Sequence, residues 1–413
     1  MNHMDWGIRF WEYGTTYFYD ANVWSFTWPN QPPGTMYIFA IVRKLFEFIF
    51  GLFWTLNIKI SIFPSGIITY LESNLYPALI HMPAILADFG IAYLIYKFTN
   101  KKWASILWLI NPVIWYNSSV WGQYDSVINF LALLSFYLLI AKKNLPTKLA
   151  KLRLSFSFLA FIFSLYIKLS LIIFVPIWLI VALKQKYRLS NWVVATGISF
   201  LGIILLSLPF AQDEPVRWLY YLYKDKVLTQ QMQVITANAF NFWSLLTGPE
   251  LRSHSLPFIG LTYQIWGYIL FGVFYLLLLY RFFRLVFINH NSLIINLVWS
   301  LALTAFSSFM LLTNMHERYL YPLFPYLTIL VGMRLVSVYP YIFISLLSLF
   351  NMYNLWFVPN VPWLVSVMSL NFNVISRLSG FFALVYFLYL YFRYNLGNGK
   401  NLVTANPSFG NKS

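Results

Sequence analysis

The chain has 413 residues, of which 60% are hydrophobic and 10% are charged, and its formal net charge is +16. Soluble domains are about 45–50% apolar and about 25% charged, so this composition excludes a soluble fold and predicts an all-α protein that crosses the membrane many times. The positive charge does not indicate nucleic-acid binding, because the basic residues gather in short links between apolar segments, as the positive-inside rule predicts. The chain contains no cysteine, which excludes disulfides and thiolate metal sites.

The N-terminal part of the chain, residues 1–77, is expected to form an extracytoplasmic loop with interfacial amphipathic helices. Residues 1–34 are rich in Trp, Tyr, Asp, Asn and Pro. Residues 35–57 are apolar but carry three charges, which favours an amphipathic helix in the membrane interface over a spanning helix. Residues 58–76 are interrupted by a Pro-Ser-Gly sequence, and we expect them to be too irregular to span.

The remainder is expected to form a transmembrane domain of residues 78–393 with about 11 helices, followed by a cytoplasmic tail at 394–413. The expected spans are residues 78–97, 103–119, 124–141, 154–167, 169–183, 191–210, 259–280, 292–313, 320–337, 341–358 and 375–393. The basic links place one end of the bundle in the cytoplasm, and the other end receives the loop 211–258 and the tips 117–126 and 314–319. Because an odd number of spans leaves the N-terminal segment with no helix to bring it outside, we expect either that a first transmembrane helix is missing, which we favour, or that the start of the chain is translocated unaided.

Polar side chains gather at the two tips. The first tip, residues 117–126, carries a carboxylate, an amide, hydroxyls and large aromatics at the outer edge of the bilayer. The second tip places His316, Glu317 and Arg318 in consecutive positions, which together offer a proton carrier, an acceptor and a phosphate ligand. A solvated loop explains this second tip equally well.

Ionisable residues also occur elsewhere. Asp5, Glu12 and Asp20 lie within sixteen residues of each other, an arrangement that a surface loop would explain as well. Asp88 lies well within an apolar span, where ionisable residues are most often functional. We expect Asp88 either to pair with Lys168 or to hydrogen-bond to a neighbouring helix.

Four motifs occur in a fixed order along the chain. They are Asn111-Pro112, Trp121-Gly122-Gln123-Tyr124-Asp125-Ser126, Asn238-Ala239-Phe240-Asn241-Phe242-Trp243 and Met315-His316-Glu317-Arg318-Tyr319-Leu320-Tyr321-Pro322. Together they resemble the GT-C superfamily of membrane glycosyltransferases, closest to the prokaryotic mannosyltransferases related to the second GPI mannosyltransferase. The resemblance covers almost the whole chain. It implies a GT-C-like helical bundle that moves a sugar, mannose in those relatives, from a polyprenyl-phosphate donor to an acceptor hydroxyl on the extracytoplasmic face of a prokaryotic cell membrane.

The resemblance also implies roles for single residues. The family carries an acidic residue soon after its first transmembrane helix, and Asp5 takes that place, so we expect Asp5 to be the catalytic base, with Glu12 and Asp20 as rivals. The donor phosphate is expected to bind Arg318, assisted by His316 and Lys168. The expected substrate-binding residues are Trp121, Gln123, Asp125, Asn238, Asn241 and Glu317. The chain departs from the family in that the helix expected before Asp5 is absent and Asn30-Gln31-Pro32 replaces an aromatic-proline pair.

Several alternatives remain open at this point. Trp121 would serve equally well as an interface anchor, Glu317 as an ion-pair partner of Arg318, and the amide segment at Asn238 and Asn241 as a helix-start cap. No ligand set with a diagnostic spacing appears, so a divalent cation such as Mg²⁺ or Mn²⁺ is an open possibility. The expected partners are the lipid-linked donor, a glycan, lipid or protein acceptor, and membrane lipids.

The competing function is a transporter or flippase of lipid-linked sugars. Such a protein needs broken helices and charges at the membrane midplane, and often contains internal repeats. Here the polar groups gather on one face of the membrane, and the two halves of the chain show no repeat. This distribution favours the glycosyltransferase.

Overall fold

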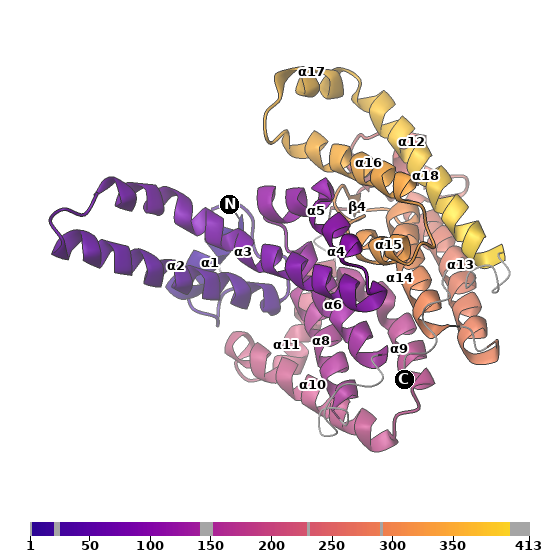
Figure 1. Ribbon diagram of the computed structural model, residues 1–413, viewed down its shortest axis with the longest axis horizontal. Helices are drawn as coiled ribbons and strands as arrows, with labels where there is room; N and C mark the ends of the chain where they lie inside the picture. Colours follow the sequence, from indigo (N-terminus) through magenta and orange to yellow (C-terminus); the bar gives the residue numbers. More distant parts are fainter. Residues whose placement is uncertain (1, 20–24, 141–151, 229–231, 290–291, 397–413) are drawn as a thin grey trace.

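The computed structural model describes residues 2–19, 25–140, 152–228, 232–289 and 292–396 (Figure 1). Within these ranges, six helices are long and apolar enough to cross a membrane. They are α3 (Gly66–Thr99), α10 (Leu189–Ala211), α13 (Tyr263–Phe283), α14 (Leu293–Leu311), α16 (Val338–Trp356) and α18 (Phe372–Leu396). The fold is therefore helical and typical of an integral membrane protein, as the composition predicts. The predicted count of about 11 spans is not confirmed.

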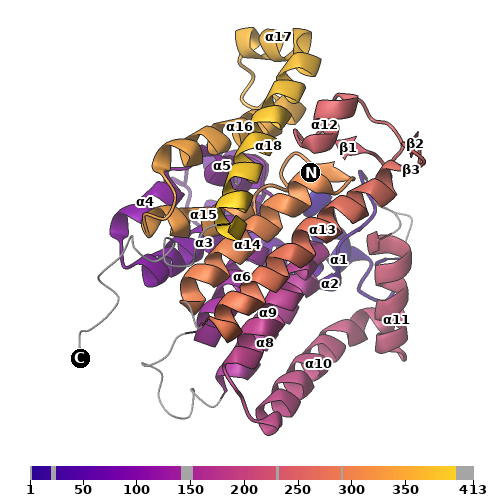
Figure 2. The ribbon, with the colours of Figure 1, turned by 90° about the vertical axis from the view of Figure 1, so that its right-hand side faces the viewer.

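Shorter apolar helices complete the bundle. They are α6 (Asp125–Ile140), α8 (Arg153–Ile167), the 3₁₀ segment η2 (Leu169–Phe174) with α9 (Val175–Lys184), and α15 (Leu323–Gly332). Helices α14 and α15 form the centre, because every residue from Asn296 to Leu311 in α14 and all of α15 are buried. A helix that is apolar on all sides is stable only when neighbours surround it. In Figure 2, α13 lies beside α14, whereas α10 and α11 form the lower right margin.

Helix α2 (Pro33–Lys59) and the first half of α3 form a hairpin that projects to the left of the bundle in Figure 1. The predicted helix at residues 35–57 is thus present. The prediction of irregular structure at 58–76 is wrong from Gly66 onward, because α3 continues through Pro77 and Pro83 into the bundle. Proline within a helix is tolerated in membrane proteins where neighbouring groups satisfy the freed backbone. The predicted boundary after residue 77 consequently falls inside one helix.

The predicted span 103–119 is broken into α4 (Lys102–Leu109), α5 (Pro112–Trp115) and the π-helix η1 (Tyr116–Val120). Pro112 causes the break, because proline disfavours helical conformation in the residue before it. Asn111 then caps α5 by accepting a hydrogen bond from the Val113 N–H at 3.0 Å. The interruption expected between the predicted spans 154–167 and 169–183 is present, because Lys168 is extended, with φ −155° and ψ 127°, between α8 and η2.

The remaining elements are short helices and strands. In chain order they are α1 (Asn2–Glu12), α11 (Pro215–Tyr221), the π-helix η3 (Leu222–Leu228), β1 (Thr236–Ala237), α12 (Phe242–Thr247), β2 (Pro257–Phe258), β3 (Leu261–Thr262), the π-helix η4 (Arg284–Ile288), β4 (Met315–His316) and α17 (Pro362–Leu370). Strand β1 pairs in parallel with β4, and β2 pairs antiparallel with β3. The predicted tail at 394–413 begins inside α18, and its residues from 397 on lie outside the described ranges.

Candidate functional site

Four of the predicted site residues come from three separate segments and lie in one cluster. The Lys168 Nζ atom is 2.6 Å from Asp125 Oδ1, and Arg318 Nη1 is 2.6 Å from Glu317 Oε1. The two pairs are neighbours, because Arg318 Nε lies 3.9 Å from Asp125 Oδ2. We call Asp125, Lys168, Glu317 and Arg318 the charged cluster.

Local structure explains how each segment reaches the cluster. Asp125 is the first residue of α6, where a negative side chain is stabilised by the positive end of the helix dipole. Lys168 stands at the break between α8 and η2, which exposes its side chain to the neighbouring segments. Glu317 and Arg318 directly follow β4, and the pairing of β4 with β1 fixes the course of that segment. The cluster therefore depends on two helix interruptions and one strand pair.

The turn before Asp125 has a strict conformational requirement. Gly122 has φ +68°, and a Cβ atom at this position would lie 2.5 Å from the His81 imidazole. The Gln123 N–H donates to the Asn117 carbonyl at 2.9 Å, and the His81 Nδ1 atom contacts the Ser119 carbonyl at 2.9 Å. Glycine at 122 thus allows α3 to pack closely against the turn that presents Asp125.

Aromatic rings line the cationic side of the charged cluster. The Arg318 guanidinium lies over Trp121 at 5.3 Å from the ring centroid and over Tyr319 at 5.4 Å. The Lys168 ammonium lies 5.2 Å from the Tyr319 centroid. Trp121 also makes an edge contact with Trp356 at 5.6 Å between centroids. These rings hold both cations in place and exclude water on one side.

Several buried polar atoms at this site lack hydrogen-bond partners among the described residues. They include Asp125 Oδ2, Arg318 Nε and Glu317 Oε2, together with both amide atoms of Asn117. The side chain of Asp125 is 4% exposed and that of Glu317 is 1% exposed. Buried polar groups are nearly always hydrogen-bonded, and exceptions concentrate at functional sites. The cluster can therefore both donate hydrogen bonds to a ligand and accept hydrogen bonds from it.

Burial and neighbouring charges set the protonation of the 316–318 segment. Burial lowers the pKa of His316 below its ordinary value, more strongly than the adjacent Glu317 raises it. Burial raises the pKa of Glu317, but the nearby His316 imidazole, 3.8 Å from its carboxylate, and the charge of Arg318 outweigh it, so that the pKa lies below its usual value. At neutral pH the segment consequently holds a neutral imidazole, a carboxylate and a guanidinium.

A second polar group adjoins the charged cluster. The Tyr321 hydroxyl donates to Asp88 Oδ1 at 2.7 Å. The Ser118 hydroxyl lies 3.1 Å from that of Ser126, which follows Asp125 in the chain. Of the two predictions for Asp88, the ion pair with Lys168 is wrong, because Lys168 pairs with Asp125 instead. The hydrogen bond to a neighbouring segment is what the structure shows.

The N-terminal carboxylates lie apart from the charged cluster. Asp5 is buried in α1, its Oδ1 atom is 3.4 Å from Arg9 Nε, and its Oδ2 accepts from the Ser25 N–H at 3.0 Å. Glu12 is half-exposed and pairs with Arg9 at 2.7 Å. Asp20 lies outside the described residues. Within the described ranges, no hydrogen bond or ion pair joins Asp5 or Glu12 to the cluster, and their catalytic role remains a prediction.

Helix α1 approaches the cluster through His3, which the sequence did not single out. Its ring stacks on Phe39 at 4.5 Å between centroids and makes an edge contact with Tyr124 at 5.3 Å. Burial lowers the pKa of His3 to about 3, and the charges of Arg318 and Lys168 act in the same direction. An isolated histidine in an aromatic segment carries no spacing signal, so sequence reasoning had no means of finding it.

The two predicted substrate-binding asparagines take different positions. Asn241 caps α12 by accepting from the N–H groups of Trp243 and Ser244, and it donates to the Phe309 carbonyl at 3.0 Å. Both the oxygen and the nitrogen of the Asn241 side chain thus hydrogen-bond within the protein, which favours the helix-cap interpretation. Asn238 forms a backbone bridge with His316, and its Nδ2 atom is buried without a partner among the described residues. Only Asn238 retains a donor for a ligand.

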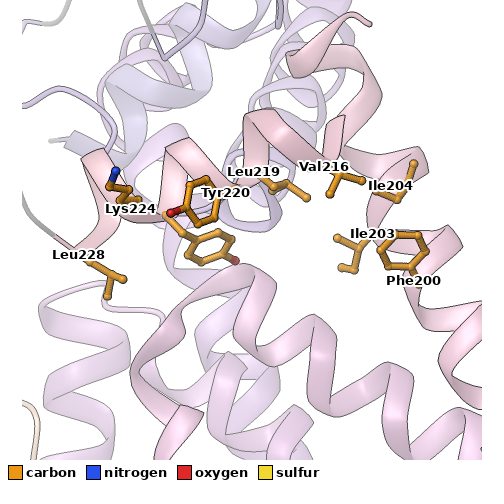
Figure 3. Close-up of a pocket in the computed structure, with 9 residues that line it drawn as sticks. Phe200, Ile203, Ile204, Val216, Leu219, Tyr220, Lys224 and Leu228 are labelled. Atoms are coloured by element: carbon orange, nitrogen blue, oxygen red, sulfur yellow. The ribbon is translucent and has the colours of Figure 1, made fainter. Parts of the chain in front are cut away.

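An apolar cavity of about 610 Å³ opens between α10 and the α11–η3 segment (Figure 3). Its lining residues are Phe200, Ile203, Ile204, Val216, Leu219, Tyr220, Tyr223, Lys224 and Leu228. The Tyr223 hydroxyl donates to the Leu165 carbonyl at 3.3 Å, three residues before Lys168. The wall of this cavity therefore touches the end of α8 that presents Lys168 to the charged cluster.

Within the described residues, no group of three or more His, Cys, Asp or Glu side chains is arranged to hold a metal ion. The divalent cation accordingly remains a sequence-based prediction. In comparisons with known proteins, no family model matches the chain and no curated protein sequence is significantly similar to it.

Proposed function

We propose that the protein is a membrane glycosyltransferase that moves a sugar from a polyprenyl-phosphate donor to an acceptor hydroxyl. The observation that carries this proposal is the meeting of two cations, two carboxylates and aromatic rings at one end of an apolar helical bundle, beside an apolar cavity. Each feature suits one part of the substrates: cations for the phosphate, rings and carboxylates for the sugar, and the cavity for the lipid chain. The sequence resemblance to the GT-C superfamily points to the same reaction.

Arg318 is the residue best suited to bind the donor phosphate. Without substrate, Arg318 and Lys168 are neutralised by Glu317 and Asp125, which stabilises a buried cluster that would otherwise carry unpaired charge. The Nε–H group of Arg318 has no acceptor among the described residues, and a phosphate oxygen would supply one. Lys168, 15% exposed, provides the second positive charge as the leaving group gains negative charge.

In the transfer step, the acceptor hydroxyl oxygen bonds to the anomeric carbon of the sugar. The bond between this carbon and the phosphate oxygen breaks, and the polyprenyl phosphate leaves with the electron pair. The acceptor proton passes to a carboxylate, which acts as the general base. Asp5 is the base expected from the sequence, but both its oxygens have partners within α1 and Ser25. Among the described residues, Asp125 Oδ2 has no hydrogen-bond partner and lies 3.9 Å from Arg318 Nε, so we add Asp125 to Asp5, Glu12 and Asp20 as a further candidate.

The polyprenyl chain of the donor would occupy the cavity between α10 and α11. The cavity walls are almost entirely aliphatic and aromatic, as a chain of isoprene units requires (Figure 3). The contact of Tyr223 with the end of α8 connects the cavity to the segment that carries Lys168. A donor lying in this cavity would thus direct its phosphate toward the charged cluster.

The sidedness of the reaction follows from the charge distribution along the sequence. Basic links mark one end of the bundle as cytoplasmic by the positive-inside rule, and the charged cluster lies at the other end. We therefore place the reaction at the extracytoplasmic face of a prokaryotic cell membrane. Mannose is the sugar that the resemblance suggests, and the acceptor is a glycan, a lipid or a protein.

The test is a transfer assay with the purified protein in lipid nanodiscs, using radiolabelled polyprenyl-phosphate mannose and glucose and a panel of hydroxyl acceptors. We expect the wild type to form a labelled product and Arg318→Ala to lose at least a hundredfold in turnover, the order of magnitude for a single electrostatic group. Arg217→Ala is the matched control, because Arg217 forms an exposed ion pair with Glu214 and should leave turnover unchanged. Movement of the lipid-linked sugar across vesicles without any product would show a transporter and contradict the proposal.

A further inference from the structure

A second groove, of about 440 Å³, lies between the last turns of α3 and the short helix α4. Its lining residues are Ala92, Tyr93 and Tyr96 of α3 and Lys102, Ser105 and Ile106 of α4. The Ser105 hydroxyl donates to the Ala92 carbonyl at 2.6 Å and so joins the two helices at the floor of the groove. The groove is therefore part of the packed structure.

The groove and the charged cluster adjoin α3 at positions that are far apart along this helix. His81 of α3 contacts the Ser119 carbonyl in the segment that leads to the cluster. Lys97 follows sixteen residues later in the same helix, which corresponds to roughly 24 Å at about 1.5 Å per residue. This distance approaches the roughly 30 Å thickness of the bilayer core. A ligand in the groove consequently occupies the membrane leaflet opposite the charged cluster.

The rim of the groove carries lysines that pair with no carboxylate among the described residues. Lys97, Lys101 and Lys102 are all exposed, and the Lys97 ammonium lies 5.0 Å from the Tyr93 ring centroid. Within the described residues, none of these three lysines forms an ion pair with a carboxylate. The groove thus combines an anion-attracting rim with an interior that contains aromatic rings and an aliphatic side chain.

The surroundings of the groove indicate a lipid rather than a soluble ligand. Tyr93 is 57% exposed and Ile106 is 56% exposed, and both belong to apolar helices. Trp103 and Ile110 on α4 add exposed apolar surface, and Figure 2 shows α4 at the left margin of the bundle. Such a surface at the end of a spanning helix contacts lipid, where lysines close to the headgroups attract anionic phosphates.

We infer that this groove is a binding site for an anionic phospholipid. Lys97 and Lys102 hold the headgroup phosphate, and an acyl chain lies along Tyr93 and Ile106. The site is distinct from the donor site of the proposed function and does not depend on it. It would anchor the junction of α3 and α4 at one depth in the membrane, and α3 also carries Asp88 next to the charged cluster.

Native mass spectrometry of the delipidated, detergent-solubilised protein tests this inference. The probes are phosphatidylglycerol and phosphatidylcholine with identical acyl chains. We expect the wild type to bind phosphatidylglycerol at least tenfold more tightly than phosphatidylcholine. Each lysine near the headgroup contributes roughly a fivefold change in affinity, so Lys97→Ala/Lys102→Ala should weaken phosphatidylglycerol binding by roughly 30-fold.

Two further variants separate the groove from general surface charge. Lys59→Ala/Arg188→Ala also removes two exposed cations, one at the end of α2 and one at the start of α10, and should leave the preference unchanged. Ile106→Trp retains every lysine but fills the groove, and should lose phosphatidylglycerol binding. Equal binding of the two lipids by the wild type would overturn the inference, as would an equal loss in the Lys59→Ala/Arg188→Ala variant. So would full binding by Ile106→Trp.

Discussion

Replacing Lys168 by methionine removes the cation from one of the two buried ion pairs of the charged cluster. The Lys168–Asp125 contact is 2.6 Å long, and the two side chains are 15% and 4% exposed. Removing one partner of a buried pair typically costs 3–5 kcal/mol, because the other charge stays buried without compensation. Arg318 lies 3.9 Å from the other oxygen of Asp125 and offsets part of this cost, so we expect about 3 kcal/mol.

The assay is a double-mutant cycle on the free energy of unfolding, measured by titration with SDS in mixed micelles. Lys168→Met, Asp125→Asn and the double variant are compared with the wild type. Because Asp125→Asn removes the uncompensated charge, the double variant should be at least 1 kcal/mol more stable than the sum of the two single changes predicts. Strict additivity would refute the reasoning, since it would mean that the two groups do not interact in the folded protein. Lys168→Arg, which keeps the charge, should cost clearly less than Lys168→Met.

Three further outcomes follow from the structure. Tyr321→Phe removes a hydrogen bond to the buried Asp88 carboxyl group and should lower the free energy of unfolding by about 1–3 kcal/mol in the same SDS titration. Gly122→Ala should destabilise the protein by more than 1 kcal/mol, and His81→Ala should recover part of that loss because it removes the clash but not the strain at φ +68°. Burial holds the pKa of His3 at about 3, so the unfolded chain takes up a proton below about pH 6.5 that the folded protein does not. Stability should therefore fall with pH below 6.5, by up to about 1.4 kcal/mol per pH unit, and His3→Gln should flatten that slope.

Composition and hydropathy predict the fold class and several helix positions, because burial in lipid requires long apolar helices with satisfied backbones. They do not predict where a helix continues through a proline. Pro77 and Pro83 lie within α3, whereas Pro112 ends α4, and the difference depends on the packing around each residue. Helix α1 lies within residues 1–77, where interfacial helices are expected, but the sequence does not predict its bounds or its packing against α2 and α3.

For the site, the sequence predicted which tips carry chemistry but not which side chains meet. Asp125 and Arg318 lie almost two hundred residues apart and come within 3.9 Å. Asp5, which the resemblance favours as the base, instead pairs within α1. The sequence left two partners open for Asp88, and the structure shows that Lys168 pairs with Asp125 while Tyr321 hydrogen-bonds to Asp88. Three-dimensional packing of the tips decides these pairings.

The central claim is that the charged cluster binds the phosphate of a lipid-linked sugar. An electron cryomicroscopy structure of the protein with a polyprenyl phosphonate analogue of the donor tests it most directly. We expect the phosphonate oxygens about 3 Å from Arg318 Nε and the Lys168 ammonium, with the polyprenyl chain between α10 and α11. A phosphonate bound away from both side chains, with the Arg318–Glu317 and Lys168–Asp125 pairs undisturbed, would contradict the claim.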